Sequence, residues 1–226
     1  MRLFLIAAAI AAATPFVAKA KTSQDEQAWV NLTAIGPVSG DIVYFAELQP
    51  RFGDGVSRLD HVLLRGAIGW KLSPSVTVYQ GYAHVETPVK NGPDFNEERS
   101  FQQLSWNIGK PWGGELSSRT RLEQRWRSDG GDTGWRLREM LRYEHALSKD
   151  RQGSAALLWS ELFVALNDTD WGARSGFDQL RTFVGVELPI GGASTAEIGY
   201  LNQTIDQTLG RTRINHAASV TIWFRH

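Results

Sequence analysis

Arginine and glutamate recur at alternate positions between residues 115 and 127. The odd positions are polar: Glu115, Ser117, Arg119, Arg121, Glu123, Arg125 and Arg127. The even positions are less charged: Leu116, Ser118, Thr120, Leu122, Gln124 and Trp126. A β-strand sends successive side chains to opposite faces, so one face would carry a row of guanidinium and carboxylate groups. Arginine stays ionised, and its planar fork of five donors matches carboxylate groups. The pattern therefore indicates ion pairing or anion binding on one face of a strand.

The same alternation recurs in other segments, among them 42–52, 99–110, 135–147 and 177–188. An enclosed, polar barrel interior (the lumen) with an apolar outer surface accounts for it, which is the pattern of an outer-membrane β-barrel. We call the residues expected to face the interior the candidate lumen residues. They are Glu47, Arg51, Arg65, Arg99, Gln103, Arg119, Arg121, Glu123, Arg125, Arg136, Arg138, Arg142, Glu161, Arg181 and Glu197.

Two interpretations of these charges remain open. Arginines and glutamates that pair with one another would form a closed polar core, which would make the chain a structural or surface-interaction barrel without transport. Alternatively, the arginines outnumber the carboxylates, and excess positive charge in a narrow channel favours anions. The second interpretation predicts a porin-like path for a small anionic solute.

Eleven strand-like segments span the chain. They cover residues 28–35, 42–52, 57–72, 75–86, 99–110, 115–127, 135–147, 154–166, 177–188, 193–203 and 215–224. Many reach the ~9–11 residues that a tilted membrane strand requires. We therefore predict an all-β fold, an antiparallel transmembrane β-barrel of about 10–12 strands with an arginine-rich lumen. Single-chain bacterial barrels have even strand numbers, so segment 28–35 is either not a wall strand or one segment is miscounted.

Connections between the segments alternate in length. Those at 72–75, 109–114, 148–153 and 189–192 are tight, whereas those at 87–98, 128–134, 167–176 and 204–214 are long and rich in Gly, Asp and Asn. Bacterial barrels have short periplasmic turns and long outer loops. The short turns and the C-terminus are accordingly expected on the periplasmic side.

Bulk properties agree with an exported barrel. The 226 residues carry 24 basic and 24 acidic side chains, no cysteine and nine tryptophans. Zero net charge gives no reason to expect nucleic acid as a partner, and tryptophans would form the aromatic girdles of a membrane barrel. Arg2, the apolar run 3–13 and Ala18-Lys19-Ala20 form a signal peptide, so we expect a signal at 1–20 and one barrel domain at 21–226.

A few residues interrupt the pattern or resemble catalytic groups. Glu139 and Asp60 fall on the apolar face, and we expect Glu139 at a membrane interface or at a bulge. A lipid-modifying enzyme would need a serine and a histidine meeting on the outer surface. Neither a Gly-x-Ser-x-Gly motif nor a metal-spaced histidine cluster is present. We therefore expect no enzyme activity, no catalytic residue, no metal and no cofactor.

Several motifs resemble a known family. They are Glu98-Arg99, Gln102-Gln103, the run Arg119-Thr-Arg121-Leu122-Glu123-Gln124-Arg125, Arg136-Leu-Arg138, Glu161, Gln179-Leu-Arg181, Gly199-Tyr200, Gln203 and His216. In these the chain, from Trp29 onward, resembles DUF2490, a domain family of unknown function. The resemblance implies a Gram-negative outer-membrane barrel and supplies no substrate. Expected partners are the lipid bilayer and lipopolysaccharide, periplasmic chaperones, the barrel-assembly machinery and a small anionic solute.

Overall fold

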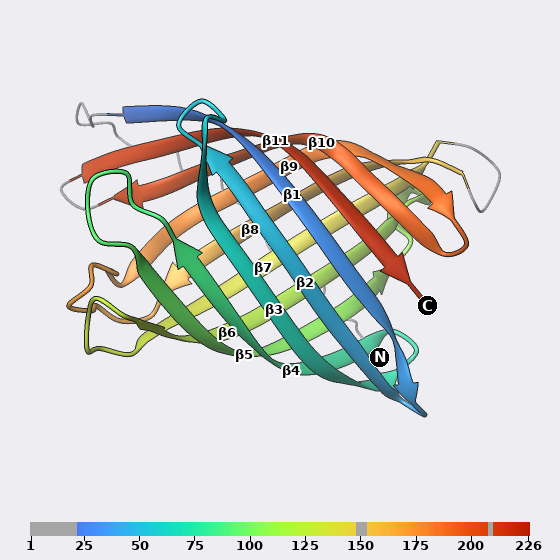
Figure 1. The fold of residues 1–226 in the computed structure, drawn as a ribbon. Coiled ribbons are helices and arrows are strands. Elements are labelled where there is room, and N and C mark those ends of the chain that lie inside the picture. The colour runs from blue at the N-terminus through green and yellow to red at the C-terminus, as the bar shows by residue number, and fades with distance from the viewer. Residues whose placement is uncertain (1–21, 148–152, 208–209) are drawn as a thin grey trace, which may run out of the picture.

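A computed structural model of the chain describes residues 22–147, 153–207 and 210–226. These residues form a closed β-barrel of steeply tilted strands (Figure 1). In chain order the strands are β1 (Thr22–Ser39), β2 (Ile42–Gly53), β3 (Arg58–Ser73), β4 (Val76–Thr87), β5 (Phe95–Gly109), β6 (Glu115–Arg127), β7 (Gly134–Ala146), β8 (Ala155–Ala165), β9 (Gly176–Gly191), β10 (Ser194–Gln207) and β11 (Arg211–Arg225). A short 3₁₀ turn, η1 (Pro111–Gly113), joins β5 to β6. The all-β barrel prediction is confirmed.

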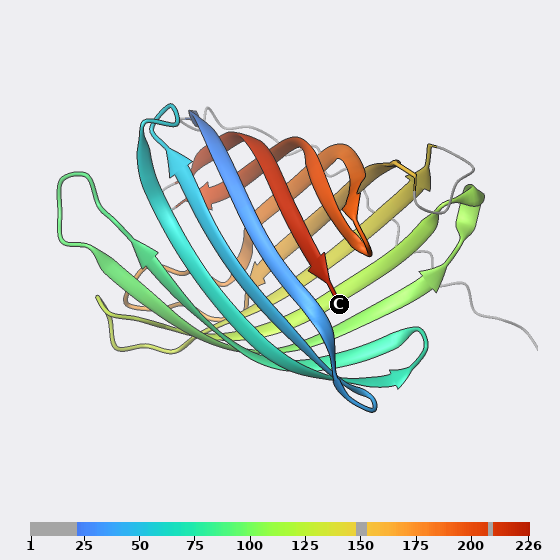
Figure 2. The same cartoon turned by 45° about the vertical axis from the view of Figure 1, so that its right-hand side comes forward.

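The barrel closes through its first strand. β1 pairs with β2 in antiparallel fashion and with β11 in parallel fashion, so Trp29 is opposite Arg51 on one side and Ser219 on the other. Figure 2 shows β1 lying between these two strands. The doubt about the first segment was therefore misplaced: it is a wall strand, longer than expected, and the described strands number eleven.

The ends of the barrel differ in their connections. At the short-turn end, β1–β2, β3–β4 and β9–β10 are joined by two residues each. At the long-loop end, 88–94, 128–133 and 166–175 join β4–β5, β6–β7 and β8–β9. The expected long loop at 204–214 is wrong, because strand pairing continues to Gln207 opposite Arg211. The expected turn at 148–153 lies largely outside the described residues.

Side chains sort by the two faces of the wall. Large apolar residues point outward and stay exposed, among them Leu48, Leu64, Leu104, Leu158, Leu162, Leu180, Val184 and Ile198. Exposed aromatic residues lie near both ends: Trp70, Trp106, Trp112 and Phe224 at the short-turn end, and Trp126, Trp135 and Phe177 at the long-loop end. Inside, Trp29, Leu157, Phe183, Leu201 and Ala217 form a small buried apolar cluster. None of the helices among the described residues is long and apolar enough to span a membrane.

Two residues differ from their expected places. The β2–β3 register shifts between Arg51 and Phe52, and Asp60 is the extra residue, so its side chain reaches the interior instead of the apolar face. Glu139 does lie on the outer face, but in the middle of β7 with no register shift in its pairing to β6 or β8. There its carboxylate accepts hydrogen bonds from the hydroxyls of Ser118 and Thr120, each at 2.5 Å.

Candidate anion-binding interior

The barrel interior holds two cavities. One, of about 210 Å³, lies toward the long-loop end, where Phe95 and Arg127 line it. The other, of about 460 Å³, lies toward the short-turn end, where Ser75 and Arg225 line it. Five residues line both cavities: Trp29, Arg51, Arg65, Arg138 and Arg181. We call the layer that these five form with their immediate ionic partners the dividing layer.

The candidate lumen residues come together around these cavities. Fourteen of the fifteen line one cavity or both. The exception is Glu123, which is 1% exposed and covered by the arginines bound to it. These residues face the interior because side chains alternate between the two faces along each strand. The inward positions of neighbouring strands are also in register, so Glu47 lies opposite Arg65 and Arg121 lies opposite Arg138.

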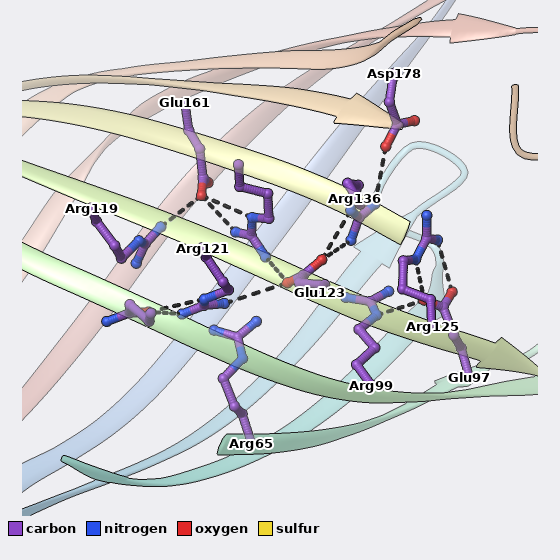
Figure 3. A network of polar contacts seen from close by, with 12 residues as sticks. Arg65, Glu97, Arg99, Arg119, Arg121, Glu123, Arg125, Arg136, Glu161 and Asp178 are labelled. Carbon is purple, nitrogen blue, oxygen red and sulfur yellow. Dashed lines mark hydrogen bonds and ion pairs between the residues drawn. The ribbon is translucent and has the colours of Figure 1, made fainter. Parts of the chain in front are cut away.

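Glu123 and Glu161 form the centre of a buried ion-pair network. Glu123 accepts hydrogen bonds from the Arg136 and Arg138 guanidinium groups, each at 2.6 Å. Glu161 accepts from Arg138 at 2.7 Å and from Arg119 at 2.8 Å. Figure 3 shows Arg119 pointing toward Glu161, and Arg136 pointing toward Glu123. Each carboxylate thus bridges two arginines, which offsets the cost of removing the charges from water.

Smaller networks lie toward the two ends of the barrel. Near the long-loop end, Glu97 accepts from Arg125 at 2.6 Å and from Arg99 at 2.7 Å (Figure 3). Toward the short-turn end, three carboxylates surround Arg142, those of Glu144, Glu187 and Glu197. The network near the long-loop end therefore has one more arginine than carboxylates, and the network around Arg142 has more carboxylates than arginines.

Aromatic rings separate the guanidinium groups. The Arg121 guanidinium lies 4.4 Å from the centroid of Phe101, and those of Arg138 and Arg181 lie 4.4 and 4.6 Å from that of Phe163. Such cation–π contacts stabilise a cation that water no longer solvates. Gly81 makes room for Phe101, since a Cβ at that position would stand 2.1 Å from the ring.

Two arginines of the dividing layer have no carboxylate partner among the described residues. Arg51 donates to the amide oxygen of Gln49, and Arg181 donates to that of Gln179 at 3.1 Å. Both guanidinium groups instead flank the indole of Trp29, at 3.8 and 5.0 Å from its centroid. The middle of the barrel consequently carries positive charge that its own carboxylates do not neutralise.

Sequence reasoning missed the inward aromatic residues Trp29, Phe101 and Phe163. The alternation of side chains places each of them on the inward face, but the prediction considered only charged and amide side chains. Asp178 was also missed: it pairs with Arg136 at 3.0 Å from an even position of β9, whose other inward residues are odd. The register of β8 with β9 shifts next to it, between Phe163 and Val164, and a shift of this kind changes which residues face inward.

Comparison with known proteins places the chain in a family. The model of a family described as a protein of unknown function (DUF2490) matches residues 26–215. This chain belongs to the DUF2490 family. An uncharacterized protein of Methylorubrum extorquens is 51% identical over 222 residues, which cover 98% of this chain and 97% of that protein. No solved structure matches the DUF2490 barrel.

The histidines of this DUF2490 protein bond to partners other than serine in the part that the structure describes. His84 bonds to Glu86 and Glu98 on the outer face, and His216 bonds to the Tyr200 hydroxyl at 2.6 Å. His61 pairs with Asp60 at 2.8 Å. The serine–histidine contact that a lipid-modifying enzyme would need on the outer surface is not formed by these residues.

Proposed function

We propose that this DUF2490 barrel lies in the bacterial outer membrane. Strands of 11 to 18 residues are long enough to cross a bilayer at a steep tilt. Exposed leucines and valines cover the outer wall, and exposed tryptophans lie near both ends, as membrane girdles do. The signal peptide expected at 1–20 would agree with this location. Lipopolysaccharide would surround the barrel, and chaperones and the barrel-assembly machinery would insert it.

Within that location, we infer that the interior forms a narrow path that prefers small anions. The uncompensated charge of Arg51 and Arg181 carries this inference, because both residues line the cavities on the two sides of the dividing layer. A solute moving between the cavities must pass these guanidinium groups. Arginines that face a narrow passage and lack a carboxylate partner attract anions and repel cations. The proposed role is therefore passage or binding rather than catalysis.

A closed structural barrel is the second candidate. The ion pairs of Glu123 and Glu161 favour it, since they fill the middle of the interior with mutually bonded side chains. The loop at 166–175 adds to the closure, because Trp171 is 9% exposed and lies 5.0 Å from the Arg125 guanidinium.

Planar-bilayer recording of the refolded barrel tests the path. Across a KCl gradient we expect small unitary conductances whose reversal potential follows chloride. Replacement of Arg51 and Arg181 by glutamine should reduce this anion preference. Arg211→Gln should leave it close to that of the wild type, because Arg211 is exposed at the long-loop end of β11 and is in the lining of neither cavity. Silent bilayers, or a reversal potential that follows potassium, would contradict the path and favour the closed barrel.

A further inference from the structure

The dividing layer contains hydrogen-bond donors that its own acceptors do not use. Arg65 donates from Nη1 to Glu47, yet its Nε is buried and has no partner among the described residues. Two arginines that bond to carboxylates of the layer also have a buried donor without a hydrogen bond to the described residues, at Nε of Arg119 and at Nη1 of Arg121, although the latter lies 3.7 Å from a Glu123 oxygen. The side chain of Arg65 is 6% exposed and that of Arg121 1% exposed, so bulk water does not reach these groups freely. A buried guanidinium donor without an acceptor is costly, which suggests an acceptor that comes from outside the chain.

Charge in this layer is also unbalanced. Glu47, Glu123 and Glu161 are its carboxylates. Seven guanidinium groups lie in the layer or bond to these three: Arg51, Arg65, Arg119, Arg121, Arg136, Arg138 and Arg181. Of these, Arg136 also pairs with Asp178. Arg138 is satisfied by Glu123 and Glu161, whereas Arg51 and Arg181 bond to amide oxygens alone. A ligand that carries more than one negative charge would restore the balance.

We propose that the dividing layer is a binding site for a polyvalent oxyanion of the phosphate or sulfate class, held by Arg51, Arg65 and Arg181 beside Trp29. All four residues line both cavities, so an anion bound there would be reachable from each cavity. The inference rests on the proposed function, since it names the ligand at the layer that the anion path must cross.

Geometry favours an oxyanion over a halide. A guanidinium group presents parallel N–H donors that match two oxygens of one phosphate or sulfate, and several arginines engage a tetrahedral anion from different sides. Arg51 and Arg181 approach the same indole ring, and the Gln49 and Gln179 amides orient them. A single chloride would satisfy fewer donors and less of the excess charge.

Thermal unfolding of the folded mature chain in detergent tests the site, with phosphate, sulfate, acetate and chloride compared at equal ionic strength. Phosphate and sulfate should raise Tm of the wild type in a saturable manner, acetate should do so weakly, and chloride should have little effect. The double variant Arg51→Gln/Arg181→Gln should bind phosphate about tenfold more weakly or worse. The same variant should be more stable than the wild type in chloride, because mutual repulsion is relieved. Arg211→Gln, at an exposed position of β11 outside the lining of both cavities, serves as the control and should keep the phosphate response.

Absence of a phosphate or sulfate shift in the wild type would overturn the site, as would an unchanged shift in the double variant. If the double variant does not fold, titration calorimetry of phosphate binding to the wild type and to Arg51→Lys tests the site instead. Lysine keeps the charge but lacks the planar fork of donors, so Arg51→Lys should bind phosphate more weakly. Conductance separates this site from the path. Phosphate binding in a barrel that does not conduct would keep the site and reject the path, whereas anion conductance without phosphate binding would do the reverse.

Discussion

Single residues of the interior differ sharply in what they contribute to stability. Glu123 is 1% exposed and bonds to Arg136 and Arg138, so Glu123→Gln would leave two buried guanidinium groups short of counter-charge. We expect a loss of about 3–5 kcal/mol, the range found when one partner of a buried ion pair is removed. Urea unfolding of the refolded barrel, followed by its heat-modifiable gel mobility, measures the loss.

Arg121→Met is the matched control at the same depth. Arg121 bonds to the Gln103 amide oxygen, and its Nη1 lies 3.7 Å from Glu123 without a hydrogen bond to any described residue. Its removal takes away excess positive charge and leaves Glu123 paired, so we expect a change within about 1 kcal/mol or a gain. Equal losses for Glu123→Gln and Arg121→Met would mean that the positive charge of Arg121 stabilises the network as much as the Glu123 carboxylate does, and is not in excess.

At the scale of elements, two long loops are held together by reciprocal carboxylate contacts. Asp170 accepts from the backbone N–H groups of Gly131 and Asp132, and the Asp132 carboxylate accepts from the N–H of Asp170. The bond from Gly131, followed by that from Asp132, holds the pKa of the Asp170 carboxyl below its ordinary value. The loops at 128–133 and 166–175 therefore form one unit over the long-loop end.

This pKa shift gives the loop contact a defined pH dependence. Because the pKa is lowered in the folded loops, their packing is favoured at pH values above the ordinary carboxyl pKa and is lost as the pH falls through the lower, folded value. Hydrogen exchange, corrected for its intrinsic pH dependence, should show both loops protected at pH 6 and still at pH 4, and released in stronger acid. Asp170→Ala should release them at every pH, whereas Asp41→Ala in the β1–β2 turn should not. Release that begins well above pH 4 would contradict this account.

The strands were more predictable from the sequence than the way in which they close the barrel. Alternation located every strand, because an inward charge and an outward leucine cannot exchange faces without burying the charge in an apolar surface. It could not reveal that β1 pairs in parallel with β11, since a parallel closing pair leaves the same alternation as an antiparallel one. Asp60 was assigned to the wrong face and Asp178 was not predicted to face inward. Each lies beside a register shift, which depends on the neighbouring strand. Glu139 was expected at a membrane interface or at a bulge, because the strand pattern does not show the β6 hydroxyls that hold an outward carboxylate in the middle of β7.

The charged composition of the interior was predictable from the sequence, but its separation into paired and unpaired arginines was not. Charged residues at inward positions follow from parity alone, and the excess of arginine is countable in the sequence. Which arginines find a carboxylate depends on the stagger between strands several positions apart, as in the pair of Arg119 on β6 with Glu161 on β8. The two unpaired arginines at Trp29 are therefore a property of the closed barrel as a whole.

Insertion of the whole barrel in a bilayer makes a depth-dependent prediction. Val220 lies in the middle of β11 on the outer face, between Val30 and Ile198 in the register. Leu72 lies at the short-turn end of β3 and is 65% exposed. If the outer wall meets hydrocarbon, Val220→Arg should cost roughly 2–4 kcal/mol, whereas Leu72→Arg near the interface should cost about 0–1 kcal/mol. Equilibrium unfolding from lipid vesicles measures both. Similar small losses for the two variants would mean that the wall faces water, because water solvates an arginine equally well at either height.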